Sequence, residues 1–450
     1  MNMRYPLIAA AVAIATSAGT AYAAVPTLAQ AITATTAGDY VVIAGSSAAQ
    51  TAVGNAIGVD LCGGTANELT ISSTGNKNFF AYSCSLAHAV GSIASGTIVT
   101  FYYRSEGGSV VGALPIATGY HPKRLNLSDA SCTASGSTGT CAVTGTTATN
   151  GPGDSWTGAV TPDAVMLGIT DVEPAQLTGL DYPSNYTPGV WGTATASEMA
   201  GLAKAVIIQQ VFGLAVNTSG MTLNSANNGA VNLSRESAAN ILSGNYSDWA
   251  HVPDALTGNP ITTNSPSIVH VDREPGSGTR TATNIYFLGY QCGTANAIIS
   301  GSGETLNYST SDELTLANNT PGSISYASID NLLPPKNTAY TNLVLATLNG
   351  VVPSTLAAAA GQYDFWYEAT ALNNPANTGA SAALASYLVD GTTGMGAIAY
   401  APSQKDINVV PNLYGNTGTV PLTQGTQSYA VYVNPYHRSG DSCNVPGETN

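Results

Sequence analysis

One arginine and a turn rich in glycine, serine and threonine follow a β-strand run, and together they could bind an oxyanion. The segment spans 273–279 and precedes a run that could form a helix. Gly276 and Gly278 let the backbone approach a ligand, and the first-turn N–H groups of a helix are unpaired at the positive end of its dipole. Ser277 and Thr279 add hydroxyl donors, and Arg273 adds a planar charged fork that matches oxyanion oxygens. A plain glycine-rich turn with a serine cap is the alternative.

A carboxylate follows a second apolar strand run. The run delivers Thr170 and Asp171 into a loop. An ionised carboxylate only accepts hydrogen bonds, so in an anion site Asp171 would select a protonated oxyanion such as hydrogen phosphate and repel sulfate. The alternative is that Asp171 forms an Asx turn or caps a helix.

Two further loops could present hydroxyl and backbone donors at helix starts. Ser46 and Ser47 follow the first strand run, and Ser105 and Ser109 flank a glycine pair after another. The sequence does not decide between Ser105 and Ser109, and Glu106 adds a negative charge beside them. Each loop taken alone also fits an ordinary connection.

Taken in order, these segments resemble the periplasmic phosphate-binding protein of bacterial phosphate ABC transporters and its wider family of two-lobed substrate-binding proteins. The most specific segment is 273–279, which is similar to the family's Arg-x-x-Gly-Ser-Gly-Thr loop. Further similarity lies at 42–47, 168–172, 233–249 and 322–326.

The resemblance implies a division of the ligand contacts between two lobes. Arg273, Ser277, Gly278 and Thr279 would bind the anion from one lobe, and Ser47 with its neighbour Ser46, together with Asp171, would bind it from the other. The family often has an acid two residues after the arginine, where it braces the guanidinium. Pro275 stands there in this sequence, so Glu274 would have to substitute.

Composition excludes several classes of protein. The chain has 450 residues, with 12 Lys and Arg against 26 Asp and Glu, a formal net charge of -14. It is too acidic to neutralise nucleic-acid phosphates and too apolar, at 44%, to be disordered on composition. Beyond residue 23 there is no apolar run near the length that spans a membrane.

Apolar runs that alternate with helix-like segments indicate an α/β fold. The strand runs are 40–44, 97–103, 164–168, 206–216 and 267–271, and helices are expected after Ser234 and over about 379–390. Several runs are continuously apolar, as in strands buried on both sides of a parallel sheet. The resemblance to the two-lobed binding-protein family implies two lobes with mostly parallel sheets and two crossovers, which we place near 206–217 and 363–372. One lobe would comprise 24–211 plus 362–450 and the other 212–361.

The N-terminus and the cysteines indicate export. Residues 1–23 read as a signal peptide, with Arg4 before an apolar run and Ala21-Tyr22-Ala23 at the cleavage site. An even number of cysteines in an exported chain suggests disulfides, and six allow 15 pairings. Proximity favours Cys62–Cys84 and Cys132–Cys141 and leaves Cys292–Cys443 by elimination. The segment 131–160 reads as a surface excursion pinned by one of these bonds.

These observations favour a non-catalytic, exported receptor, periplasmic or extracellular, for a small oxyanion, above all hydrogen phosphate. We expect a monomer with no cofactor, no bound metal and no nucleic-acid partner, and an ABC permease is the partner that the resemblance implies. A secreted structural or adhesive protein with a decayed site is the first alternative. An extracellular phosphatase is the second, although the sequence shows no clear activated nucleophile or metal cluster.

Overall fold

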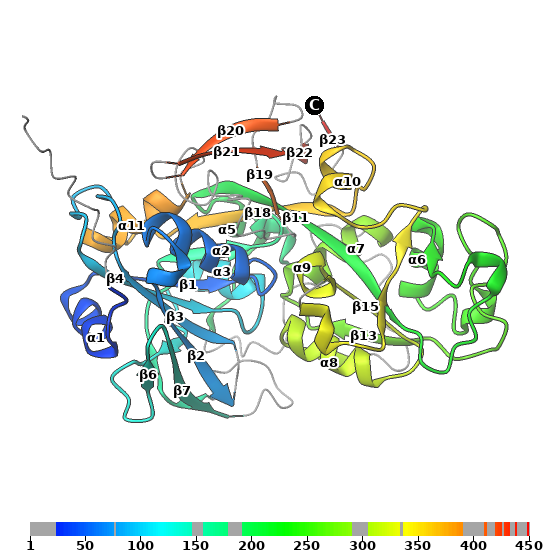
Figure 1. Cartoon of the computed structure of the whole chain (residues 1–450), viewed down its shortest axis with the longest axis horizontal. Helices are drawn as coiled ribbons and strands as arrows, with labels where there is room; N and C mark the ends of the chain where they lie inside the picture. The colour runs from blue at the N-terminus through cyan, green and yellow to red at the C-terminus, as the bar shows by residue number, and fades with distance from the viewer. Residues whose placement is uncertain are drawn as a thin grey trace, which may run out of the picture.

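The computed structural model describes residues 24–75, 78–145, 156–178, 191–289, 305–333 and 336–389. Of the C-terminal part it describes only the short strand segments 409–411, 419–424, 427–432, 437–438 and 448–449. Two lobes lie side by side, the first at the left of Figure 1 and the second at the right, and a pair of long strands runs between them. This arrangement confirms the expected two-lobed α/β class with two crossovers.

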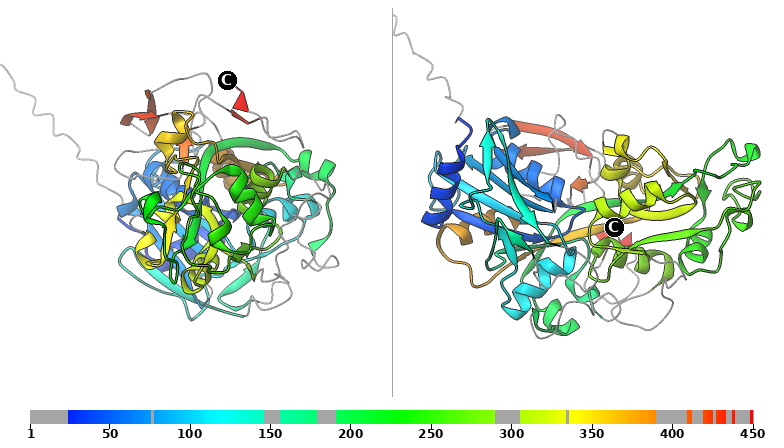
Figure 2. Two further views of the ribbon diagram at one scale, coloured as in Figure 1. Left: turned by 90° about the vertical axis from the view of Figure 1, so that its right-hand side faces the viewer. Right: turned by 90° about the horizontal axis from the view of Figure 1, so that it is seen from below.

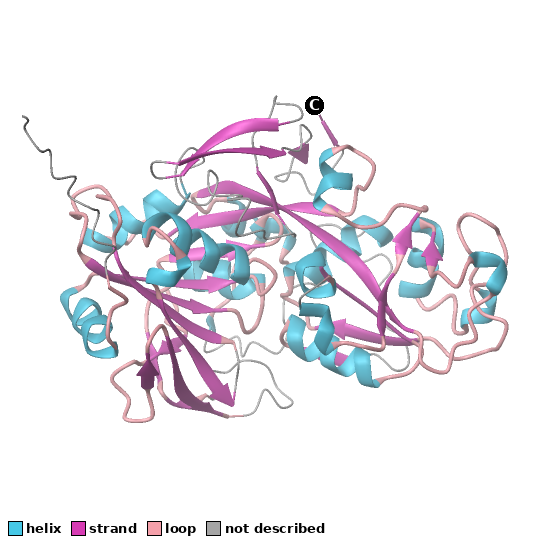
Figure 3. Cartoon of the chain, in the orientation of Figure 1, coloured by secondary structure: helices cyan, strands magenta, loops and turns pink. Residues whose placement is uncertain are grey.

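The first lobe is built on a sheet with helices packed against it (Figure 3). Its strands are β1 (Tyr40–Gly45), β2 (Leu69–Gly75), β3 (Phe79–Ser85), β4 (Ile98–Arg104), β5 (Lys123–Leu125), β6 (Thr133–Ser135), β7 (Thr138–Thr144), β8 (Thr157–Gly158), β9 (Val160–Pro162) and β10 (Leu167–Thr170). Its helices are α1 (Leu28–Ala37), α2 (Gln50–Ala56), which continues into the π-helical turn Ile57–Leu61, α3 (Ser109–Thr118), α5 (Ala196–Ala200) and α11 (Gly379–Val389), with 3-10 turns at Thr65–Asn67 and Pro174–Gln176.

The second lobe repeats the scheme on a smaller scale. Its strands are β12 (Asn232–Leu233), β13 (Val269–Arg273), β14 (Thr305–Asn307), β15 (Ser323–Ser328), β16 (Leu343–Leu345) and β17 (Thr347–Leu348). Its helices are α6 (Arg235–Leu242), α7 (Gly278–Leu288), α8 (Thr310–Asn319), α9 (Ile329–Leu332) and α10 (Thr355–Ala359), with 3-10 turns at Ser225–Asn227, Trp249–His251 and Lys336–Ala339. Ser234 caps α6 by accepting from the Ser237 amide, as the sequence predicts.

The crossover strands are β11 (Lys204–Asn217) and β18 (Trp366–Asn373). They pair antiparallel, and they join the two halves of one sheet whose order is β14-β13-β15-β11-β18-β10-β1-β4-β3-β2-β7-β6. Where they meet, the Tyr363 hydroxyl donates to the Phe212 carbonyl at 2.7 Å and the Phe212 amide donates to the Phe365 carbonyl at 3.0 Å. These contacts hold the two crossovers together.

The C-terminal segments add short strands beside this frame. They are β19 (Val409–Pro411), β20 (Thr419–Gln424), β21 (Gln427–Tyr432), β22 (His437–Arg438) and β23 (Glu448–Thr449). The strand β19 pairs antiparallel with the middle of β11, while β20 and β21 form a hairpin above the crossovers in Figure 1. The crossover strand β11 is thus flanked on both edges.

Parallel pairing determines where the loops gather. In the first lobe β1 pairs parallel with both β4 and β10, and in the second β13 pairs parallel with both β14 and β15. The carboxyl ends of parallel strands lie at one edge of a sheet, where α/β folds bind ligands. In the view from below (the right panel of Figure 2) the two lobes lie on either side of the strands that cross between them.

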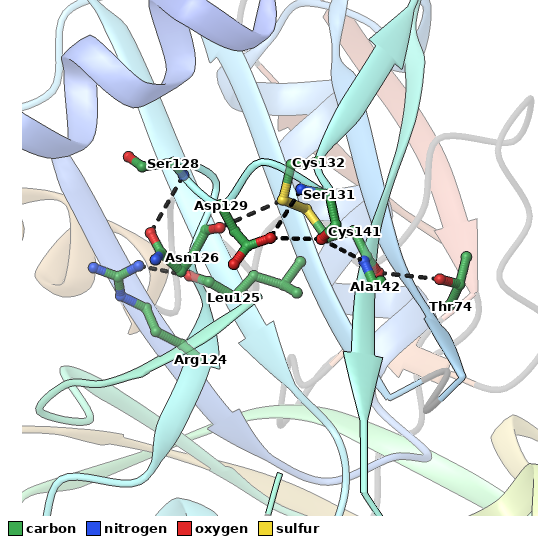
Figure 4. The surroundings of a disulfide bond; sticks show 10 residues. All are labelled: Thr74, Arg124, Leu125, Asn126, Ser128, Asp129, Ser131, Cys132, Cys141 and Ala142. Atoms are coloured by element: carbon green, nitrogen blue, oxygen red, sulfur yellow. Dashed lines mark hydrogen bonds between the residues drawn. A yellow bond between two sulfur atoms is a disulfide. The ribbon is translucent and has the colours of Figure 1, made fainter. Parts of the chain in front are cut away.

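Two of the predicted disulfides are present. Cys62 bonds to Cys84, and Cys132 bonds to Cys141. The second bond pins the exposed β6–β7 hairpin, where the Ser131 hydroxyl oxygen also accepts from the Ala142 amide at 3.2 Å (Figure 4). The disulfide is where the sequence predicted it, but the expected surface excursion over 131–160 is only partly right: β7 pairs with β2 in the main sheet, and Cys141 and Val143 are buried. Residues 146–155 of this segment lie outside the described residues. Cys292 and Cys443 lie outside the described residues, as does the predicted signal peptide.

A glycine brings α3 into direct contact with the first sheet. A Cβ on Gly112 would lie 2.8 Å from the Ala44 carbonyl oxygen and from the Ile169 amide nitrogen, both backbone atoms. The helix therefore packs at backbone distance over β1 and β10, and this contact fixes where its N-terminus lies.

We predict that Gly112→Ala destabilises the protein by about 1–3 kcal/mol, because α3 must move off the sheet to admit the methyl group. Urea unfolding measures the change. Gly201→Ala is the matched control: its Cβ would lie 3.4 Å from the nearest atom, in ordinary contact, so we expect a change within about 0.5 kcal/mol. Equal unfolding free energies for wild type and Gly112→Ala would contradict the close packing.

Candidate anion site

Loops from both lobes meet between the two halves of the large sheet. The loops after β1, β4 and β10 come from the first lobe, and those after β13 and β14 come from the second. The Val110 amide of the first lobe donates to the Gly276 carbonyl of the second at 3.0 Å. The lobes are therefore in direct contact here, and the side chains at the contact are mostly buried.

Asp171 lies at the centre of this contact and is 2% exposed. One carboxylate oxygen accepts from the Ser46 hydroxyl and, at 2.8 Å, from the Gln210 amide nitrogen, and the other accepts from the Thr279 hydroxyl at 3.3 Å. Burial raises the pKa of Asp171, while its hydrogen bonds and the Arg273 charge oppose that rise. The side chain is an acceptor that donors from both lobes surround.

Arg273 is also buried, and the loop after β14 holds its guanidinium. Nε donates to the Asn307 carbonyl and Nη2 to the Tyr308 carbonyl, both at 3.2 Å. Nη1 donates to the hydroxyls of Thr310, at 3.0 Å, and of Ser47, at 3.3 Å, and those two hydroxyls are 3.0 Å apart. The one arginine of the predicted loop thus reaches across to the first lobe.

Three helices of ten or eleven residues begin at the site. Ser109 is the first residue of α3, Ser277 caps α7 and Thr310 is the first residue of α8. The Ser109 hydroxyl oxygen accepts from the Asp171 amide at 2.9 Å, and a Cβ on Gly278 would lie 2.7 Å from Asp171 Cβ. The positive ends of three helix dipoles therefore face one small region, which favours a bound anion.

Not every predicted site residue lies in this cluster. The structure brings together Ser46, Ser47, Ser109, Asp171, Arg273, Gly276, Ser277, Gly278 and Thr279. The Ser105 hydroxyl instead donates to the Asn78 carbonyl at 3.3 Å. The Thr170 hydroxyl donates to the Val172 carbonyl at 2.7 Å and so stabilises its own turn. Of the two serines that the sequence left open, Ser109 is the one at the contact.

Glu274 does not brace Arg273 as the resemblance implied. Both of its carboxylate oxygens are buried without a hydrogen-bond partner among the described residues, and Arg273 uses its donors elsewhere. Burial and the negative charge of Glu106 raise the pKa of Glu274 well above its usual range, against the opposing charges of Arg273 and Arg280. A protonated, neutral Glu274 is the state that this environment favours.

Two other buried acids near the site have cationic partners, while Glu313 of α8 accepts from the Ser325 hydroxyl and the Tyr326 amide. Glu106, a concern in an anion site, accepts from Arg104 at 2.7 Å, and Asp272 lies 3.4 Å from Arg280. The charge of Glu106 is therefore balanced within its own lobe. Among the described residues no cluster of three or more His, Cys, Asp or Glu side chains is arranged to hold a metal ion.

Sequence reasoning missed two residues of the cluster. Thr310 follows β14, and a serine before it with an acid three positions later was a readable helix-start signal. Gln210 is one of two adjacent glutamines inside the otherwise apolar crossover run, and that interruption was its signal. Neither signal by itself indicates that the residue lies beside Asp171 or Arg273.

Comparisons with known proteins give matches among solved structures alone. No family model matches the chain, and no curated protein matches it. A high affinity periplasmic phosphate-binding protein (PfluDING) bound with phosphate is similar over 82% of this chain and 90% of that one, at 13% identity and a TM-score of 0.45. A phosphate-binding protein from Stenotrophomonas maltophilia is similar over 74% and 78%, at 12% identity and a TM-score of 0.38.

An ABC-type phosphate transport receptor from Vibrio cholerae is similar over 48% of this chain and 69% of that one, at 17% identity and a TM-score of 0.31. Two of these solved structures are phosphate-binding proteins, and the third is a phosphate transport receptor.

We predict that Glu274→Gln changes how stability depends on pH. The folded state keeps the Glu274 proton above the usual glutamate pKa, where the unfolded chain releases it, so wild type loses up to about 1.4 kcal/mol per pH unit between the two pKa values. The variant lacks this loss, and its melting temperature relative to wild type should rise from pH 4.5 to pH 8.

Glu236→Gln, at an exposed position on α6, is the control and should follow the wild-type curve. Parallel melting curves for wild type and Glu274→Gln over this range would show that the Glu274 carboxyl is not held protonated.

Proposed function

We propose that this protein is a non-catalytic receptor for a small oxyanion, with hydrogen phosphate as its preferred ligand. The observation that carries the proposal is that the buried acceptor Asp171, Arg273 and the starts of three helices lie together where the lobes meet. Backbone N–H groups and hydroxyls can bind an oxyanion although they themselves carry little net charge. The acceptor adds selectivity, because a protonated oxyanion can donate to it and sulfate cannot.

In this proposal the first lobe comprises 24–211 and 362–450, the second comprises 212–361, and the anion binds between them. Entry requires the lobes to part, a hinge motion about β11 and β18. The bound anion would take over donors that now serve contacts between the lobes, such as the bond from Thr279 to Asp171 and the one from Arg273 to Ser47.

Export is part of the same proposal. A signal peptide at 1–23 would direct the chain out of the cytoplasm, and the two observed disulfides fit an oxidising compartment. No helix in the described residues has the length and apolar character to cross a membrane. An exported receptor of this type would work as a monomer and pass its ligand to an ABC permease or scavenge it outside the cell.

A secreted structural protein is the second candidate. The observation in its favour is that Asp171 and Arg273 already have partners within the protein. A closed pair of lobes held by such bonds could serve as a rigid body, and anion binding would then be absent.

We predict that Arg273→Ala weakens phosphate binding roughly a hundredfold or more, because truncation removes the only positively charged group in the cluster that touches both lobes. Isothermal titration of the mature protein measures the change. Arg235→Ala, an exposed arginine of the same lobe that donates to the Tyr286 carbonyl, should bind like wild type. No phosphate heat from wild type at micromolar protein would contradict the receptor proposal and favour the structural one.

We predict that Asp171→Asn gains sulfate affinity by about tenfold or more, because the asparagine amide can donate to a fully ionised oxyanion. Competition between sulfate and phosphate measures the selectivity. Unchanged selectivity would show that Asp171 is not the selecting group. Release of inorganic phosphate from a generic phosphoester would instead point to a phosphatase.

A further inference from the structure

Gln210 is a buried polar residue on the crossover strand β11, and it reaches the candidate anion site from outside the predicted loops. Its side chain is fully buried, and its amide nitrogen donates to Asp171 Oδ1 at 2.8 Å. Its neighbour Gln209 is equally buried, but successive side chains of a strand point to opposite faces. The glutamine pair therefore provides one residue at the site and one away from it.

The three side-chain donors to Asp171 differ in what they can do if the carboxyl gains a proton. Ser46 and Thr279 are hydroxyls, which can donate to a carboxylate or turn and accept from a carboxylic acid. The amide nitrogen of Gln210 has two N–H groups and no lone pair for accepting. A proton on the facing oxygen weakens this bond, and the glutamine can accept from the acid only by turning its carbonyl oxygen inward, so in the observed orientation the Gln210 bond favours the carboxylate form.

We propose that Gln210 is a positioning residue that determines specificity. By donating to the carboxylate it keeps Asp171 a hydrogen-bond acceptor, so the ligand must supply the proton of the hydrogen bond between ligand and Asp171. This inference rests on the proposed function and deepens it. Hydrogen phosphate carries such a proton, and sulfate at neutral pH does not. Sulfate is admitted once Asp171 itself is protonated, because the acid then donates to the ligand.

The charged and titratable groups around Asp171 make the pH at which its carboxyl is protonated sensitive to the hydrogen bond from Gln210. Arg273 on β13 is the charged group that faces Asp171, and it favours the carboxylate, while Tyr103 on β4 is a buried, neutral phenol. Burial raises the pKa of Asp171, and the Gln210 bond is among the contacts that lower it. Removing the bond should therefore move protonation of Asp171, and with it sulfate binding, to higher pH.

The test is sulfate binding as a function of pH, because sulfate does not titrate between pH 4 and 8 whereas phosphate does. Wild type should admit sulfate with a midpoint at low pH. Gln210→Met, which keeps the length of the side chain and removes the donor, should raise that midpoint by about one pH unit or more. Gln209→Met is the matched control and should keep the wild-type midpoint.

A second variant, Gln210→Glu, makes the result independent of packing defects in the first. Two facing carboxyls share a proton, so its midpoint should rise further than that of Gln210→Met. A wild-type midpoint in folded Gln210→Met and Gln210→Glu overturns the inference, as does an equal shift in Gln209→Met. Wild-type protein that binds no phosphate at any pH, with no sulfate gain in Asp171→Asn, overturns the proposed function itself.

Discussion

A carboxylate buried where two lobes touch is the constraint on which the rest of this structure depends. Burying Asp171 without donors would be costly, and the chain supplies them from the loop after β1, from the crossover strand and from the start of α7. Each of these donors reaches Asp171 only if the backbone of its own element lies close to the loop that carries Asp171. The close contact of Gly278 with Asp171 and that of Gly112 with the first sheet follow from this requirement.

Most of the buried arginines near the contact between the lobes also have carboxylate partners. Arg104 is paired with Glu106 and Arg280 lies beside Asp272, so each guanidinium is near a carboxylate on its own side of the contact. Arg273 differs, because it is held by carbonyl and hydroxyl oxygens. Its charge is not cancelled by a bonded acid, which is why an otherwise cation-poor chain can present a positive centre to an anion.

Many of the strands and the glycine-rich loop of the candidate site could be predicted from the sequence, because each has a strong local pattern. The apolar runs became β1, β4, β10, β11 and β13, and the glycine- and serine-rich turn after β13 does open a helix. Tertiary contacts decided the rest. Ser105 and Ser109 are four positions apart, and only the packing of α3 on the sheet places Ser109 at Asp171. Gln210 and Thr310 reach the cluster from elements whose convergence no local pattern encodes, and the burial of Glu274 away from the Arg273 donors is likewise set by tertiary packing.

The crossover topology also determines how the chain can fold. Strand β10 pairs with β1 along one edge and with β18 along the other. In the second pair Thr170 lies opposite Thr370, 200 positions away along the chain. Strands β13 to β15 lie within 269–328 and find their partners over shorter separations. Loop-closure entropy slows long-range pairing, so the pairing of β10 with β18 should be among the last contacts to form. Pulse-labelled hydrogen exchange during refolding would resolve that order, and a chain cut before residue 366 would leave the first lobe's sheet open at β10.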